Sequence, residues 1–251
     1  MKFCKMFRNF RLIVLLVGCP VICLKVQAQT FSVGITSVWT HTNQVVKMVH
    51  SEEDFQNTDY CLSLCYEQVL KNKRYVLFGS FSRFSGNTWI KFSEGSVIAP
   101  DGFPVVGDGF SGVNVTRLDF GLQYNLLSAK KRFYLRPFLG FGIQISRKNG
   151  DEIWAEYLKT AGPDYAELEP VTAEPLNTVQ VVPTLGFKTG IALWRRLDLS
   201  FTVQGVYGFK SYQNMFYKYA YRGVPQETAV FEATGTGMFY TLGIGYRFRK
   251  L

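Results

Sequence analysis

The most regular pattern in the chain lies at its end, where apolar residues alternate with small or polar ones through residues 235–248. Successive side chains of a β-strand point to opposite faces, so this period of two indicates a strand with two unlike faces. One face carries Thr236, Met238, Tyr240, Leu242, Ile244, Tyr246 and Phe248. The other carries Gly235, Gly237, Phe239, Thr241, Gly243, Gly245 and Arg247. The apolar face predicts contact with a second sheet in a soluble sandwich, or with lipid in an outer-membrane barrel.

Seven earlier segments also have the character of strands, at residues 29–40, 60–67, 75–90, 117–126, 133–146, 179–193 and 199–209. Apolar residues fall on both faces of 75–90, so the sequence leaves open which of its faces points inward. Pro137 and Pro183 fall inside two of these segments. Proline lacks the N–H of a ladder hydrogen bond, so we expect local bulges or bends at both positions. The helical period is absent from the chain except for a single possible turn near residues 151–159.

The connections between these segments alternate in length. The short ones are residues 71–74, 128–132 and 194–197, and the long ones are 41–59, 91–112, 148–176 and 211–234. Short turns at one end and long loops at the other are typical of outer-membrane barrels. The fold class predicted is therefore all-β: an eight-stranded antiparallel transmembrane β-barrel with four long extracellular loops and three short periplasmic turns. Aromatic residues near the segment ends match interfacial girdles: Trp39, Tyr75, Trp89, Phe133, Trp194, Tyr246 and Phe248.

Residues 1–28 have the pattern of an export signal, which leaves residues 29–251 as the barrel domain. A basic start precedes an apolar run at residues 12–24, and Val26-Gln27-Ala28 places small residues before a cleavage site at Gln29. The apolar run is shorter than the roughly 20 residues that a spanning helix needs. An alternative is the lipobox-like Leu16-Val17-Gly18-Cys19, which would make Cys19 a lipidated first residue. The apolar residues that continue after Cys19 favour simple cleavage.

Removing this segment changes the charge and cysteine content. The whole chain has a net charge of +9, but residues 1–28 hold five basic residues and no acid, so 23 basic and 19 acidic residues remain, a net charge of +4. This value is too mild to indicate a nucleic-acid partner. Cys61 and Cys65 lie about 13 Å apart if they share a strand face, beyond the roughly 7 Å that a disulfide allows. We interpret them as small side chains on the lumen face, and neither a metal site nor a cofactor is predicted.

The signal that ends in Val26-Gln27-Ala28-Gln29, the lumen glycines and the aromatic-rich last strand together resemble small outer-membrane barrels of the kind common in Bacteroidetes. These include the PorT-like proteins, and the architecture is similar to the OmpA-type membrane domain. The resemblance covers the mature chain and implies a location in the bacterial outer membrane. One departure is that Arg249-Lys250-Leu251 follows Phe248, whereas an aromatic residue usually ends such chains.

The predicted lumen face carries charged side chains, namely Glu67, Arg117, Asp119, Arg136, Lys188 and Arg247. An eight-stranded barrel is just wide enough for side chains to fill it, and an unpaired buried charge is costly. We therefore expect a structural ion-pair network, with a narrow ion-conducting pore as the alternative. A lipid-A-modifying enzyme is a second alternative. Its only neighbouring His–Ser pair would be His50 and Ser51, which side-chain alternation separates, so no catalytic residue is predicted.

The remaining candidates for function are the long loops, since function on a rigid scaffold usually lies in connecting segments. Tyr212, Phe216, Tyr217, Tyr219 and Tyr221 are candidates for an adhesive surface, or for the upper girdle and the tops of extended strands. The function expected is that of a non-enzymatic outer-membrane barrel, structural or partner-binding. Expected partners are outer-membrane lipid or lipopolysaccharide and other envelope proteins. The PorT-like resemblance implies that such a partner is a component of a secretion complex.

Overall fold

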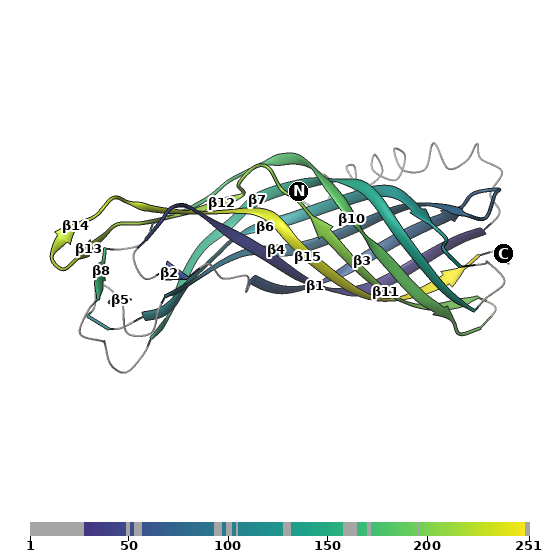
Figure 1. Cartoon of the computed structure of the whole chain (residues 1–251), viewed down its shortest axis with the longest axis horizontal. Coiled ribbons are helices and arrows are strands. Elements are labelled where there is room, and N and C mark those ends of the chain that lie inside the picture. The colour runs from purple at the N-terminus through teal and green to yellow at the C-terminus, as the bar shows by residue number, and fades with distance from the viewer. Residues whose placement is uncertain are drawn as a thin grey trace, which may run out of the picture.

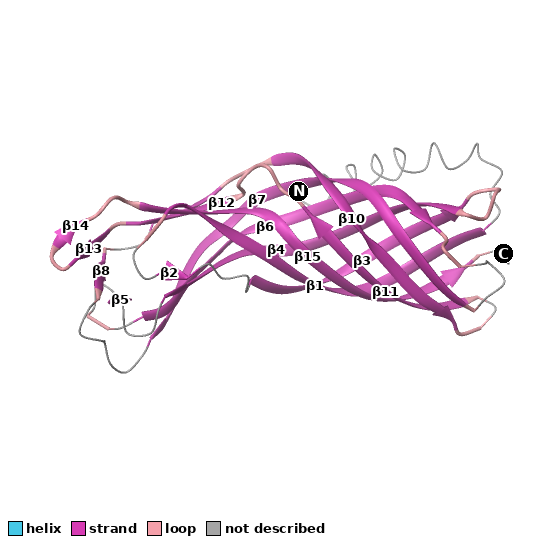
Figure 2. Ribbon diagram, viewed as in Figure 1, coloured by secondary structure: helices cyan, strands magenta, loops and turns pink. Residues whose placement is uncertain are grey.

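The computed structural model describes residues 28–48, 51–52, 57–92, 97–98, 102–103, 105–127, 132–157, 165–169, 172–194 and 196–248. The regular structure of these residues consists of strands (Figure 2). They are β1 (Ala28–Val46), β2 (Ser51–Glu52), β3 (Asn57–Val69), β4 (Tyr75–Phe92), β5 (Val97–Ile98), β6 (Val105–Tyr124), β7 (Phe133–Tyr157), β8 (Ala166–Leu168), β9 (Thr172–Pro175), β10 (Val179–Ala192), β11 (Leu197–Val206), β12 (Gln213–Tyr217), β13 (Tyr219–Tyr221), β14 (Val224–Pro225) and β15 (Ala229–Arg247). Among the described residues, no helix is long and apolar enough to cross a membrane. The helical turn expected near residues 151–159 is wrong where the chain is described, because residues 151–157 continue β7.

Eight of the strands form a closed antiparallel barrel in the order β1-β3-β4-β6-β7-β10-β11-β15 (Figure 1). The closing pair is β1 with β15, which runs in register from Thr30 opposite Arg247 to Thr40 opposite Gly237. The predicted fold class is therefore confirmed. The pattern of residues 235–248 that indicated a strand belongs to β15, which pairs with β1 on one side and β11 on the other.

Large apolar side chains cover the outside of the barrel. Leu62 on β3, Leu139 on β7 and Leu185 on β10 are 68%, 69% and 65% exposed, and Ile35 and Ile244 are each 61% exposed. β10 has the cleanest alternation, with Val179, Val181, Pro183 and Leu185 outside and Gln180, Val182 and Thr184 inside. A monomeric soluble protein rarely exposes so large an apolar surface. The outer face therefore matches the lipid-facing band of a transmembrane barrel.

The two ends of the barrel differ, and we call them the turn end and the loop end. The turn end holds the short connections after β3, β6 and β10, together with the start of β1 and the end of β15 (Figure 1). At the turn after β3, the backbone N–H of Leu70 donates to the carbonyl of Tyr75 and Lys73 has a φ of 57°. The long connections all lie at the loop end, as expected from their order in the sequence.

The expectation of bulges or bends at Pro137 and Pro183 is wrong as far as bulges go, because the register between β7 and β10 is unbroken through both prolines. The carbonyl of Pro183 accepts from the N–H of Tyr207, so its backbone faces β11, whose ladder with β10 ends next to it at Thr184. The carbonyl of Leu135 accepts from the N–H of Leu126, and residues two apart on a strand face the same neighbour, so the backbone of Pro137 faces β6, whose ladder with β7 ends at Phe138. Each missing N–H therefore falls beyond the end of a ladder and costs no pairing.

Pairing also resolves the facing of β4, which the sequence left open. Val76, Phe78, Ser82 and Phe84 are buried on the inner face, whereas Tyr75, Leu77 and Phe81 are exposed. The apolar residues on both faces of β4 have different roles, because the outer ones meet lipid and the inner ones fill the lumen.

At the loop end several strands run beyond the barrel and the connections fold onto them (Figure 1). β6 has 20 residues and β7 has 25, about twice the 9 to 11 needed to cross a membrane. β12 pairs with β15 and β9, and a second sheet has the order β14-β13-β8-β5. A separate hydrophobic core forms here: Met48, Ile90, Phe92, Val97, Val105, Ala166, Leu168, Met215, Tyr217, Tyr219, Ala229 and Phe231. We call this part of the molecule the extension.

Candidate functional site

The candidate site is the interior of the barrel, where the predicted charged residues lie. Glu67, Arg117, Asp119, Arg136 and Lys188 are at most 6% exposed, and the Arg247 side chain is 14% exposed. They come from β3, β6, β7, β10 and β15, and the period-two alternation of each strand places them on the inner face. Buried charges need partners, so the pairing of these groups decides what the interior can do.

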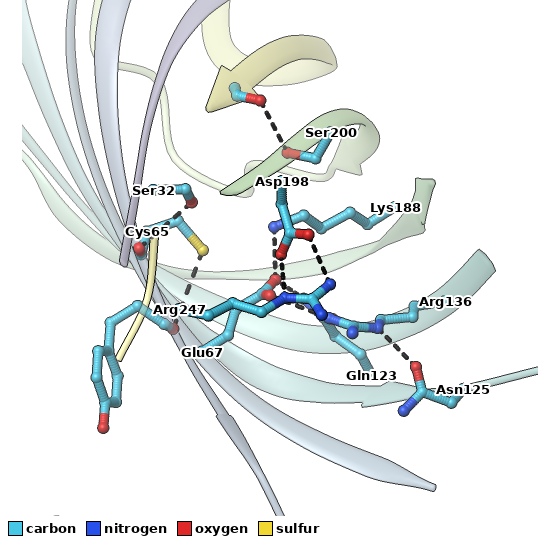
Figure 3. A network of polar contacts seen from close by, with 12 residues as sticks. Ser32, Cys65, Glu67, Gln123, Asn125, Arg136, Lys188, Asp198, Ser200 and Arg247 are labelled. Carbon is cyan, nitrogen blue, oxygen red and sulfur yellow. Dashed lines mark hydrogen bonds and ion pairs between the residues drawn. The ribbon is translucent and has the colours of Figure 1, made fainter. Parts of the chain in front are cut away.

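Glu67 is the centre of a network near the turn end (Figure 3). Its Oε1 accepts hydrogen bonds from Lys188 Nζ at 2.6 Å and from Gln123 Nε2 at 2.9 Å, and its Oε2 accepts from Arg136 Nη1 at 3.0 Å. Arg136 also donates from Nε to Asn125 Oδ1 at 2.6 Å and lies over the ring of Tyr134. One carboxylate thus joins β3 to β6, β7 and β10, which closes the lumen near this end.

Arg247 pairs with a carboxylate that the sequence analysis did not single out. Its Nε and Nη2 donate to the two oxygens of Asp198, each at 2.6 Å, in a bidentate pair between β15 and β11 (Figure 3). Asp198 precedes Ser200, Thr202 and Gln204 with the same period of two. Extending the inner face of that strand by one position would have found it.

A second network lies further toward the loop end. Arg117 Nε donates to Asp119 Oδ2 at 3.0 Å, and Arg117 Nη2 donates to Gln204 Oε1 at 3.0 Å. Ser80 Oγ donates to the same oxygen of Asp119 at 3.2 Å. The guanidinium carbon of Arg117 lies 3.7 Å from the centre of the Phe239 ring, which is a cation–π contact.

A cavity of about 60 Å³ lies between the two networks. Its wall includes Arg117, Asp119, Lys188 and Gln204, together with the hydroxyl groups of several serines and threonines: Ser32, Thr36, Ser63, Ser80, Ser82, Ser200, Thr202 and Thr241. A water needs roughly 10–15 Å³ on this measure. The cavity is therefore large enough for a few water-sized species, within a wall that combines these polar groups with the rings of Phe78 and Phe138.

An apolar plug closes the lumen on the loop side of the cavity. It consists of Val38, Cys61, Phe84, Val113, Val115, Val182, Val206, Tyr212, Ala233 and Phe239. Tyr212 is 0% exposed and Phe239 is 1% exposed, and the Phe84 and Phe239 rings meet edge to face at 5.5 Å. Phe239 was the exception on the polar face of the last strand, and its place in the plug explains it.

The lumen glycines make room for aromatic rings on the next strand. Gly121 lies opposite Phe78, Gly186 opposite Phe138, and Gly190 opposite Tyr134. A Cβ at Gly121 would lie 2.6 Å from the Phe78 ring, and one at Gly186 would lie 2.7 Å from the Phe138 ring. The Phe78 and Phe138 rings in turn contact each other edge to face at 5.2 Å. The glycines therefore let large side chains fold flat into a narrow barrel.

Other candidates from the sequence lie elsewhere. Cys61 and Cys65 are free, with Cys61 in the plug and Cys65 in the wall of the cavity. No three metal-ligating side chains converge within the part of the chain that the structure describes. His50 and the side chain of Ser51 lie outside that part. Of the two interpretations of the aromatic residues in this segment, the adhesive surface is wrong for Tyr212, Tyr217 and Tyr219. These rings are buried, Tyr212 in the plug and the other two in the core of the extension.

The exterior and interior together invert the arrangement of a soluble protein, with apolar side chains outside and paired charges inside. In a closed barrel this inversion is the signature of a membrane-spanning sheet. The protein is an outer-membrane β-barrel. Its turn end accordingly faces the periplasm, and its loop end with the extension faces the outside of the cell.

Comparisons with known proteins return only distant likenesses. No family model matches the chain, and no curated protein matches it. OprG from Pseudomonas aeruginosa aligns with a TM-score of 0.47 and 10% identity, over 90% of this chain and 98% of that chain. A major outer membrane protein from Thermus thermophilus aligns with a TM-score of 0.43 and 12% identity, over 88% and 99%. The N-terminal β-barrel domain of Pseudomonas aeruginosa OprF aligns with a TM-score of 0.38 and 11% identity, over 89% and 100%. Because these scores are low, they carry no weight in identifying the protein as an outer-membrane barrel. The strand pairing, the apolar outer face and the charged inner face of this barrel do so.

Proposed function

We propose that this protein is a non-enzymatic outer-membrane barrel with a closed lumen, which presents its extension to a partner outside the cell. The observation that carries the proposal is the division of the molecule into two separately packed parts. The lumen is closed by the Glu67 network and the apolar plug, whereas the extension has its own buried core. A core of that size beyond the membrane stabilises a defined surface, which a simple membrane anchor does not need.

The most prominent part of that surface is the hairpin of β13 and β14. Arg222 and Gly223 have φ angles of 53° and 75°, which matches the two-residue turn that suits the twist of paired strands. Residues 222–227 are all exposed, and Val224 is 59% exposed at the tip. A hairpin tip with an exposed apolar residue is a suitable contact point for another envelope protein, such as a component of a secretion complex.

Site-specific photo-crosslinking in living cells tests this role. A photoreactive residue at Val224 is expected to give a discrete crosslinked product with one envelope protein. The same residue at Lys73, in the turn at the periplasmic end, is the matched control and is expected to give no such product. Crosslinks from Lys73 but not from Val224 would show that the partner binds on the periplasmic side. Purification of a clean monomer, with no crosslink from either position, would reject partner binding.

A narrow channel is the second candidate, favoured by the polar cavity within the lumen. Planar-bilayer recordings separate the two, since a closed lumen is expected to give no discrete conductance steps. A lipid-A-modifying activity is tested by replacing His50 and Ser51 with alanine and comparing lipid A by mass spectrometry. The proposal expects identical lipid profiles, and a changed profile would contradict it.

Maturation by removal of residues 1–28 is also part of the proposal. Ala28 is the first residue of β1, where it pairs with Val69, and residues 1–27 lie outside the described part of the chain. The intact mass of the protein from the outer membrane is expected to correspond to a chain that begins at Gln29. A lipid-modified chain that begins at Cys19 would show that the lipobox-like sequence is used instead.

A further inference from the structure

Two arginine side chains interrupt the apolar outer face of the barrel. Arg83 on β4 and Arg147 on β7 are both exposed. Because side chains alternate along a strand, Arg83 lies on the same face as Phe81 and Arg147 on the same face as Phe141, and both phenylalanines are exposed on the outside. Within the described strands of the barrel, below the extension, the outer face carries no other lysine or arginine.

Strand pairing brings the two arginines to one place, because β6 lies between β4 and β7. Arg83 lies opposite Thr116 of β6, and Arg147 lies opposite Asn114, two positions further along the same face of β6. Neighbouring strands are about 4.8 Å apart and a strand rises about 3.3 Å per residue, so the two arginine Cα atoms are about 12 Å apart. Two arginine side chains can reach one bound molecule across this separation. We call Arg83, Ser85, Asn114, Thr116 and Arg147 the outer arginine patch.

The charges of the patch are not neutralised from within the described chain. The ion pairs there join Arg117, Arg136, Lys188 and Arg247 to carboxylates on the inner face, and neither arginine of the patch takes part in one. Asp59 is the carboxylate that reaches nearest along β4, where it accepts the backbone N–H of Ser85 at 2.6 Å. It shares the inner face of β3 with Glu67, however, because the two residues are an even number of positions apart. Both guanidinium groups are therefore available to an anion outside the protein.

The depth of the patch in the membrane follows from the strands that carry it. β4 begins at Tyr75 and β6 ends at Tyr124, and these two rings contact each other at 5.4 Å at the turn end. A strand crosses the membrane in about 9–11 residues, which leads from these tyrosines to residues 83–85 on β4 and 114–116 on β6. The patch therefore lies at the outward border of the apolar band, at the level of the lipid headgroups of the outer leaflet.

We infer that the outer arginine patch binds the phosphate groups of one lipopolysaccharide molecule in the outer leaflet. A guanidinium offers parallel N–H donors that match the oxygens of a phosphate. Thr116 and Asn114 lie between the two arginines, and their hydroxyl and amide groups can form hydrogen bonds with sugar hydroxyls. Phe81 and Phe141, on the same strands toward the periplasm, offer apolar surface to the acyl chains. This site is independent of any partner at the extension, because it lies on the wall of the barrel.

Native mass spectrometry of the full mature protein in detergent tests the inference, because it counts the lipid molecules that stay bound. Titration with purified lipopolysaccharide is expected to give one tightly retained molecule per barrel. Lipopolysaccharide from which the phosphates have been removed is expected to bind at least ten times more weakly, and phosphatidylglycerol is expected not to displace the intact molecule at equal concentration. Equal binding with and without the phosphates would overturn the inference. Displacement by phosphatidylglycerol would show a general attraction to anionic lipid instead, and would also overturn it.

Two double variants locate the site. Arg83→Gln with Arg147→Gln is expected to weaken the binding of lipopolysaccharide at least tenfold. Arg74→Gln with Arg132→Gln is the matched control, because it removes two exposed arginines that directly precede the same strands at the turn end, and it is expected to leave the affinity unchanged. The gel mobility of unheated samples shows whether each variant is folded, and the comparison with dephosphorylated lipopolysaccharide needs no variant. Unchanged affinity in the patch variant, or an equal loss in the control, would contradict a site at Arg83 and Arg147.

Discussion

Lys188 Nζ lies 2.6 Å from Glu67 Oε1, although the strands that carry them stand on opposite sides of the barrel. β3 and β10 are four strands apart in either direction around the closed sheet. A direct contact between them requires a lumen no wider than two extended side chains, which is the width that eight strands allow. The pair therefore serves both as a crosslink through the barrel and as part of the barrier at its periplasmic end.

Replacing Glu67 with glutamine is expected to destabilise the barrel by about 3–5 kcal/mol, because Lys188 and Arg136 would lose the carboxylate that holds them. Urea unfolding in detergent micelles, followed by tryptophan fluorescence, measures the change. Adding Lys188→Met to the same chain is expected to recover part of the loss, since it removes one unpaired charge. Glu227→Gln, at an exposed glutamate of the extension, is the control and is expected to change stability by less than about 0.5 kcal/mol. Equal stability of the Glu67 variant and the parent would show that the network is not structural.

Opening both the plug and the Glu67 network is expected to convert the closed barrel into a narrow channel. Tyr212→Ala with Phe239→Ala removes two buried rings above the cavity, and the second change also frees Arg117 from its ring contact. Because the Glu67 network still closes the periplasmic end of this double variant, discrete conductance steps in planar bilayers are expected when Glu67→Ala is added to it, and not for the parent. Phe231→Ala with Tyr217→Ala removes two rings from the extension instead and is expected to remain silent. Equal conductance of Glu67→Ala alone and of the variant that combines it with the two plug changes would show that the plug does not close the pore.

Cys65 reports on access to the cavity, because its side chain lines the wall. In a Cys61→Ser background, a water-soluble methanethiosulfonate reagent added to folded barrels is expected to label Cys65 slowly. The same reagent is expected to label it at least ten times faster in the plug variant. Mass spectrometry of the intact protein measures the rate, and unfolded protein gives the maximum. Rapid labelling of the parent would mean that solvent reaches the cavity past the Glu67 network or the plug.

Gly121→Ala is expected to destabilise the barrel by about 1–3 kcal/mol, because the added Cβ would lie 2.5 Å from the Leu139 carbonyl oxygen and 2.6 Å from the Phe78 ring. Gly205→Ala is the matched control on β11, where the nearest atom to a Cβ is Met238 Sδ at 3.6 Å. This control is expected to be neutral or slightly stabilising. The unfolding midpoints of the two variants in the same detergent measure this difference in stability. Equal midpoints would argue against the packing of rings over glycines.

The extension is expected to unfold separately from the barrel when its own core is weakened. Met215 is fully buried there, and Met215→Ala is expected to cost about 2–5 kcal/mol. Limited trypsin digestion is then expected to cut near Lys218 and Arg222 while the barrel keeps the gel mobility of a folded protein. Val224→Ala, at the exposed tip, is the control and is expected to leave the cleavage rate unchanged. Simultaneous loss of barrel and extension would show that the two parts fold as one unit.

The sequence by itself determined the barrel, because a closed antiparallel sheet in lipid imposes local rules. Each strand must alternate apolar and polar positions and cross the membrane in about ten residues. This alternation is visible within a single segment, as in Leu185 and Thr184, without knowledge of the neighbouring strand. The same alternation identified the inner face of Glu67, Arg117 and Lys188. It fixed neither their partners nor the facing of β4, where both faces are apolar for different reasons.

Only the tertiary structure decided how the interior is filled and what the loops become. The stagger of the strands around the barrel decides which charges meet. The sequence pattern of neither strand therefore predicts that Glu67 contacts Lys188 across the lumen. The prolines illustrate the same limit, because their cost depends on where neighbouring ladders end. Tyr217 and Tyr219 have the composition of an adhesive surface but are buried, since the strands of the extension gather them into one core, where the ring of Tyr217 meets that of Phe231. Such contacts join positions far apart in the chain, and a local pattern cannot encode them.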